Sequence, residues 1–155
     1  MVPLSVVVCL SLLALAGATD VRQCRGKSIS NLKENVQLSP CKKPPCKLRK
    51  GTDQEITISF QPEKDVDNIR NHVTAEVLGL PVPFFGVDGN SVCDKLYTME
   101  GEKASCPLIA GTKYHYKDKF PVLNEYPSLD TKVHWALTDG IEDVVCFEVA
   151  AKIIK

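Results

Sequence analysis

Short stretches in which apolar and polar residues alternate recur along this chain, and they constrain its fold more than any other feature. In EITISF, Ile56, Ile58 and Phe60 face one side of an extended chain and the polar residues between them face the other. This period of two is typical of a half-buried β-strand, and it recurs in residues 73–77, 114–116, 133–137 and 145–153. Turn residues separate these segments, and no long stretch has the helical period of about 3.6 residues. We therefore predict an all-β fold, an immunoglobulin-like β-sandwich of two antiparallel sheets.

Two of the connecting segments differ in composition. The segment LTDGIED is polar, and its Asp139-Gly140 pair predicts a hairpin. The segment LGLPVPFF is apolar, and Pro81 and Pro83 exclude a central strand because proline lacks an N–H group and has a fixed φ. We therefore predict an edge strand or a loop there, with apolar side chains that are partly exposed or folded over the rim of a hollow.

Residues 1–18 form an uncharged apolar run that ends in Ala16-Gly17-Ala18. Such a run followed by small residues is typical of a secretory signal peptide, although a basic residue near the start is missing. A transmembrane anchor is the alternative, but the run is shorter than the roughly 20 apolar residues that a span needs. We therefore predict that residues 1–18 are a signal peptide and that residues 19–155 form a single secreted domain.

The cysteines indicate a disulfide-bonded protein. Of the seven cysteines, Cys9 lies in the predicted signal peptide, which leaves an even number in a secreted chain. Spacing alone does not choose among the possible pairings. Proximity in sequence favours Cys41 with Cys46 and Cys93 with Cys106, which leaves Cys24 with Cys146. Zinc is the alternative for such a set, but no nearby histidine completes a zinc-binding pattern.

Charge and motif content argue against two large functional classes. Lysines and arginines number 19, as do aspartates and glutamates, which argues against nucleic-acid binding. The sequence has no G-x-S-x-G, Gly-rich phosphate-binding or H-E-x-x-H motif. His72, His115 and His134 are far apart in sequence, and we expect them at the surface rather than in a catalytic or metal site. We therefore predict no enzyme activity, no metal and no cofactor.

One local exception to the balanced charge is a basic cluster in CKKPPCKLRKG, made up of Lys42, Lys43, Lys47, Arg49 and Lys50. A solvated surface loop explains such a cluster. A docking patch for anionic lipid headgroups or for an acidic partner is the alternative.

Several segments resemble one known family and follow in the order seen there: LSPCKKPPCKLRKG, LGLPVPFFG, CPLIAGTKYHY, FPVLNEYPSL, VHWALTDG and CFEVAAKII. Over residues 19–155 the sequence is similar to the Niemann-Pick type C-2 proteins, which carry the MD-2-related lipid-recognition (ML) domain, and it resembles invertebrate members. The resemblance implies an immunoglobulin-like sandwich whose two sheets separate to hold an apolar ligand. It also implies a secreted or lysosomal lipid carrier with the disulfides Cys24–Cys146, Cys41–Cys46 and Cys93–Cys106.

The resemblance also assigns roles to individual side chains. It places the ligand-binding residues at Phe84, Val122, Tyr126, Trp135 and Phe147. Phe147 stands where vertebrate members have a second tryptophan. It places an exposed apolar patch, which in this family meets membranes or a partner transporter, at Leu78, Leu80 and Val82. The alternative is that the large apolar side chains simply fill a core, which is their usual role.

The departures from the family pattern concern the ligand. The segment between Cys93 and Cys106 is longer than in vertebrate members, and the chain has no N-x-S/T glycosylation site. The resemblance does not decide whether the ligand is a sterol, a fatty acid or a chemical signal. It implies that the carrier is a monomer that contacts a membrane or a membrane transporter transiently. Because the wider domain family includes proteins that bind microbial lipids, an innate-immune recognition module is the alternative to a carrier.

Overall fold

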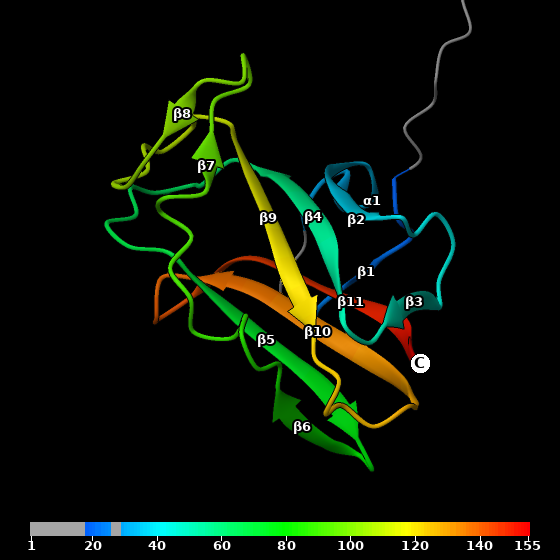
Figure 1. Cartoon of the computed structure of the whole chain (residues 1–155). Coiled ribbons are helices and arrows are strands. Elements are labelled where there is room, and N and C mark those ends of the chain that lie inside the picture. Colours follow the sequence, from blue (N-terminus) through cyan, green and yellow to red (C-terminus); the bar gives the residue numbers. More distant parts are fainter. Residues whose placement is uncertain (1–17, 26–28) are drawn as a thin grey trace, which may run out of the picture.

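The computed structural model describes residues 18–25 and 29–155, and the predicted signal peptide lies outside them except for Ala18. Two β-sheets pack face to face, and β4 and β9 of one sheet cross over β5, β10 and β11 of the other (Figure 1). The first sheet has six strands, namely β1 (Arg22–Gln23), β3 (Cys46–Arg49), β5 (Arg70–Val77), β6 (Leu80–Pro83), β10 (Asp130–Thr138) and β11 (Asp143–Ile154). The second has five, namely β2 (Val36–Ser39), β4 (Thr52–Phe60), β7 (Leu96–Tyr97), β8 (Lys103–Ala104) and β9 (Tyr114–Val122).

The predicted all-β sandwich is confirmed. Each stretch with a period of two is a strand or part of one, and the described residues contain only a single helical turn, α1 (Leu32–Asn35). No helix in the described part of the chain has the length and apolar character that crossing a membrane requires. One pairing departs from the expected antiparallel pattern, because β3 runs parallel to the end of β11. The alternating burial of β3 is visible in its four residues, but its partner could not be read from so short a segment.

The prediction for LGLPVPFF is also confirmed. Residues 80–83 form β6, which pairs with β5 at the edge of the six-stranded sheet. Prolines are compatible with this position because an edge strand pairs on one side only.

Strand register defines two ends of the sandwich. Arg70 pairs with Thr138 and Ala75 with Val133, so β5 leads into β6 at the end where β10 begins. The loop from β9 to β10 lies at this end too, which we call the β6 end. At the opposite end β10 turns into β11, as the sequence predicts, and we call this the hairpin end.

The core between the sheets is rich in aromatic side chains. Phe84, Phe120, Trp135 and Phe147 are all buried, and their rings contact one another in that order. The disulfides are Cys24–Cys146, Cys41–Cys46 and Cys93–Cys106, which are the pairings that the resemblance implies. The first joins residues 122 positions apart, and it fixes the N-terminal segment to β11 near the start of that strand.

Candidate functional site

A hollow at the β6 end, which we call the apolar groove, has a volume of about 380 Å³. Its walls come from β5, β6, the β9–β10 loop and the end of β11. The lining side chains are almost all apolar: Ala75, Val77, Val82, Pro83, Phe84, Phe85, Leu123, Glu125, Tyr126, Pro127, Leu129 and Ile153. Apolar concave surfaces with few polar groups are typical of sites for small apolar ligands.

The turn between β5 and β6 projects an apolar side chain into solvent beside this groove. Leu78 and Gly79 have φ values of 51° and 79°, so both central residues of the two-residue turn are left-handed. Such turns favour glycine and asparagine, and a left-handed conformation costs a side chain such as leucine roughly 1–2 kcal/mol. Leu78 is nevertheless present and 99% exposed. Neither backbone preference nor hydration explains an exposed leucine at this position.

Phe84 separates the apolar groove from the interior of the sandwich. Its ring lies edge-on to Tyr126 on the groove side, with 5.1 Å between centroids, and edge-on to Phe120 on the interior side, at 5.9 Å. Behind it is a void of only about 10 Å³, which Phe84, Phe120 and Trp135 help to line. The space between the sheets is therefore closed by aromatic rings, and the larger apolar hollow lies at its mouth.

A hydrogen bond ties the β9–β10 loop to the segment after β6. The Tyr126 hydroxyl donates to the backbone carbonyl of Phe85 at 2.9 Å. Partial burial raises the pKa of Tyr126 above its ordinary value, which favours the protonated form of the hydroxyl that donates this bond. The bond joins two residues that both line the apolar groove, beside the ring of Phe84.

The residues assigned from the resemblance take different positions. Phe84 and Tyr126 line the apolar groove, as does Val82 of the predicted patch, and Trp135 lines the interior void. Leu78 and Leu80 are exposed beside the groove. Two assigned residues are buried and line neither of these two hollows, namely Val122 and Phe147.

The groove contains residues that the sequence analysis did not assign. Leu123 and Leu129 flank the EYPS segment, and Ile153 lies near the end of β11. The first two belong to a loop, where no period predicts which way a side chain faces. For Ile153 a signal exists, because it continues the buried phase of β11 beyond Val149 and Ala151.

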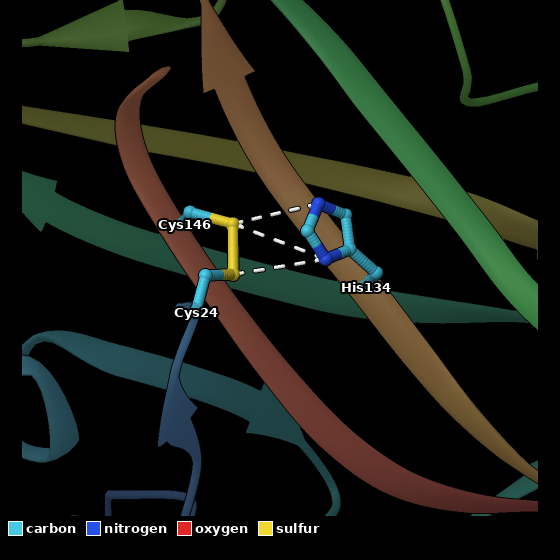
Figure 2. A group of neighbouring side chains, drawn as sticks. All are labelled: Cys24, His134 and Cys146. Carbon is cyan, nitrogen blue, oxygen red and sulfur yellow. Dashed lines mark hydrogen bonds between the residues drawn. A yellow bond between two sulfur atoms is a disulfide. The ribbon is translucent and has the colours of Figure 1, made fainter. Parts of the chain in front are cut away.

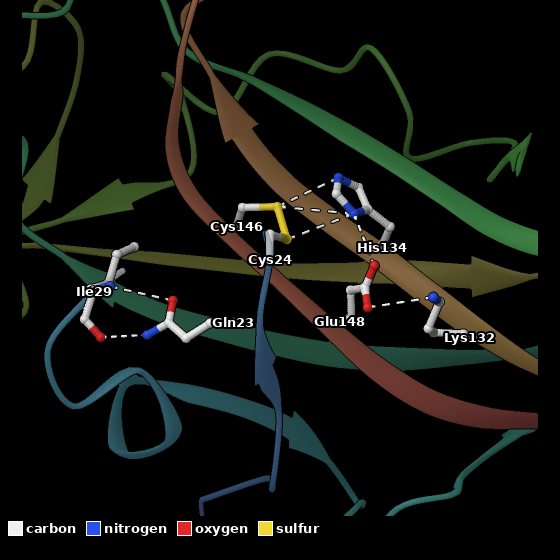
Figure 3. Close-up of a disulfide and its surroundings, with 7 residues drawn as sticks. All are labelled: Gln23, Cys24, Ile29, Lys132, His134, Cys146 and Glu148. Carbon is white, nitrogen blue, oxygen red and sulfur yellow. Dashed lines mark hydrogen bonds and ion pairs between the residues drawn. A yellow bond between two sulfur atoms is a disulfide. The ribbon is translucent and has the colours of Figure 1, made fainter. Parts of the chain in front are cut away.

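On the outer face of the six-stranded sheet, one group of side chains has the composition of a metal site. Nε2 of His134 is 3.5 Å from Sγ of Cys146, and Nδ1 is 3.7 Å from Sγ of Cys24 (Figure 2). In this structure the two sulfur atoms are bonded to each other and offer no thiolate ligands. Figure 3 shows His134 between this disulfide and Glu148, whose carboxylate also faces Lys132. The group is an imidazole packed on a disulfide.

An all-β sandwich that opens at one end into an apolar groove, backed by aromatic rings, defines a domain for small apolar ligands. The comparisons agree with this class, because residues 18–153 match the family model of the ML domain. The chain belongs to the ML-domain family, as the resemblance predicts.

Known relatives are similar to this chain over most of its length. The NPC intracellular cholesterol transporter 2 of Bos taurus is 34% identical over 132 residues, covering 84% of this chain and 80% of the bovine one. The ecdysteroid-regulated 16 kDa protein of Manduca sexta is 33% identical over 108 residues, 70% of each chain. A crystal structure of a Niemann-Pick type C2 protein from the Japanese carpenter ant has a TM-score of 0.65 and 24% identity, covering 77% of this chain and 89% of that one. This last similarity supports the fold.

Proposed function

We propose that this protein is a secreted, monomeric, non-enzymatic carrier that binds a sterol or a fatty-acid-like lipid in the apolar groove. The observation that carries the proposal is a groove of about 380 Å³ with an almost wholly apolar lining, closed against the interior by one aromatic ring. The similar cholesterol transporters and the ML-domain match support the same class of ligand. Burying several hundred Å² of lipid at about 25 cal/mol per Å² gives enough free energy for binding after the losses of association.

The groove is the entrance to the site, and the interior void is its inner part. Phe84 lines both hollows, so a rotation of its ring joins them into one space. The Tyr126 hydrogen bond to Phe85 is a single contact at the surface, and breaking it allows the walls to part. A ligand that enters here replaces aromatic contacts with its own apolar surface, so little apolar area becomes exposed to water.

The exposed side chains beside the groove form the surface for delivery. Leu78 and Leu80 are 99% and 67% exposed, and Phe85 beyond β6 is 60% exposed. An exposed apolar patch next to the mouth of a lipid site suits transient contact with a membrane or a membrane transporter. The left-handed turn at Leu78 supports this role, since an exposed leucine occupies a position that its backbone preference disfavours.

Native mass spectrometry of the purified protein after incubation with a mixed lipid extract tests the proposal. We expect one bound sterol or fatty acid per protein chain, and we expect Phe84→Trp, which fills the mouth of the interior, to lose most of it. The matched control is Phe60→Trp at the hairpin end, which should bind as the wild type does. Retention of an acylated microbial glycolipid instead would favour immune recognition, and binding of no lipid at all would contradict the carrier.

A further inference from the structure

The interior of the sandwich contains a chain of polar groups, which we call the polar layer, formed by Lys95, Asp118, Tyr116, Asn71 and the indole N–H of Trp135. The Trp135 indole donates to Oδ1 of Asn71 at 3.0 Å, and Nδ2 of Asn71 donates to the Tyr116 hydroxyl at 2.8 Å. Tyr116 donates to Asp118 at 2.9 Å, and Lys95 donates to the same carboxylate oxygen at 2.7 Å. The polar layer therefore runs from one sheet to the other and ends at the surface.

The polar layer lies across the long axis of the sandwich. On β9 the inward-facing residues from the β6 end are Val122, Phe120, Asp118 and Tyr116. On the facing sheet, Asn71 of β5 lies between buried Val73 and buried Ile69. The polar layer thus separates the aromatic side chains behind the apolar groove from the apolar core toward the hairpin end.

Displacing the polar layer is unfavourable for an apolar chain. Asn71, Tyr116 and Trp135 are buried, and every buried side-chain nitrogen and oxygen among the described residues has a hydrogen-bond partner. Burial raises the pKa of Tyr116, which keeps its hydroxyl neutral and able to donate. A hydrocarbon tail that enters between these groups offers no replacement partner, and each buried polar group left unpaired is destabilising.

We infer that the polar layer is the floor of the lipid site and that Asn71 sets the length of apolar chain the site accepts. This inference rests on the proposed lipid-binding function. The void behind Phe84 is lined by apolar side chains and the Trp135 ring, and the indole N–H of that ring is bonded to the Asn71 amide. The ligand is therefore a lipid of limited length, with its polar group left at the groove.

A series of straight-chain fatty acids of increasing length, titrated against the purified protein, measures this limit. We expect wild-type affinity to rise by about fourfold per methylene, since burying each is worth about 0.8 kcal/mol, and then to stop rising at one length. Asn71→Ala should move that length to longer chains, because it removes the amide and opens space behind it. Tyr116→Phe keeps the ring but removes the acceptor of Asn71, so it should move the limit less.

The matched control is Ile69→Ala, which creates space in the core on the far side of the polar layer. It should lower the melting temperature but leave the length limit unchanged. A limit that stays in place in both Asn71→Ala and Tyr116→Phe, or that Ile69→Ala moves equally, overturns the inference while leaving lipid binding intact. Binding of no fatty acid or sterol by the wild type overturns the proposed function and this inference with it.

Discussion

Each end of the sandwich has a turn that connects two neighbouring strands, but the contacts around the two turns differ in kind. At the hairpin end Asp139 accepts hydrogen bonds from the backbone N–H groups of Ile141 and Glu142, at 2.8 and 2.7 Å. Lys64 lies 3.1 Å from Asp139 and 3.2 Å from Glu142. Each turn has one exposed apolar side chain, Ile141 at the hairpin end and Leu78 at the β6 end, but the walls of the groove at the β6 end meet through aromatic rings and one tyrosine hydroxyl.

The hollows at the two ends differ in the side chains that line them and are similar in volume. A hollow of about 430 Å³ lies at the hairpin end and is slightly larger than the apolar groove. Its walls include Glu63, Lys64, Glu142 and Asp143, which are well hydrated and suit no apolar ligand. The hollow at the hairpin end is therefore lined by charged side chains that water hydrates well. The groove at the β6 end is lined by apolar side chains instead, and such departures from the usual surface composition are expected where a protein has a function.

The largest effect in this comparison is expected from removing one aromatic ring at each end. Phe84→Ala and Phe60→Ala both truncate buried rings, and each should lower the free energy of unfolding by about 3 kcal/mol in denaturant titration. Only Phe84→Ala should also weaken lipid binding, by about tenfold or roughly 1.4 kcal/mol, because it removes a ring that lines both hollows and contacts the ligand there. Equal losses of binding in the two variants would mean that the ends do not differ in function.

A smaller effect is expected from charging one exposed apolar side chain at each end. Leu80→Asp should slow lipid transfer to vesicles several-fold, because a carboxylate enters a membrane interface unfavourably. Ile141→Asp is the matched control, since Ile141 is 90% exposed at the hairpin end and should leave transfer unchanged. Stopped-flow transfer with equilibrium binding measured alongside separates the two roles. A loss of affinity in Leu80→Asp at an unchanged transfer rate would assign Leu80 to the site and not to docking.

Asp139→Asn tests the polar turn and should lower the free energy of unfolding by about 1 kcal/mol near neutral pH, without changing lipid binding. Two backbone N–H groups, followed by Lys64, lower the pKa of Asp139 from 3.8 to about 2. A lowered pKa in the folded state means that the ionised carboxylate stabilises the fold above pH 3.8. This contribution is lost as the pH falls toward 2. Thermal unfolding over this pH range should therefore show the wild type losing its advantage over Asp139→Asn.

The smallest effect is expected from Tyr126→Phe, which removes one hydroxyl from the wall of the groove. The loss of a single partly exposed hydrogen bond should change the free energy of unfolding by about 0.5 kcal/mol. Lipid should nevertheless exchange faster, because the two walls part more easily. Unchanged exchange kinetics would show that this bond does not hold the groove closed.

Much of the fold could be predicted from the sequence because its longer strands have one buried face. Ile56, Val73 and Trp135 each lie in a period of two that also appears in the structure. The strands that were not predicted are short: β1, β2, β3, β7 and β8 have four residues or fewer, too few to establish a period. Their positions depend on pairing with distant segments, which local sequence does not encode.

The candidate site could be predicted only in part, for a related reason. The resemblance assigns residues to strands and loops, but packing decides which of them border a hollow. Val122 is 1% exposed and lines neither the apolar groove nor the interior void, so its role as a ligand contact stays a prediction. A signal for the polar layer was present, because Asn71 and Asp118 are polar residues in the buried phase of their strands. A polar side chain in that phase indicates an internal hydrogen bond.

The two prolines of β6 have a consequence for the behaviour of the protein at high concentration. The N–H of Phe84 donates to Val73, so the N–H groups of alternate residues Val82 and Leu80 also face β5. Residues 81 and 83 would direct their N–H groups to the free edge, and both are proline. An apolar edge strand is ordinarily a template on which further copies of a chain add and aggregate. Here the free edge lacks the backbone N–H donors for that addition. The protein can therefore expose an apolar surface that contacts lipid while resisting growth into fibrils.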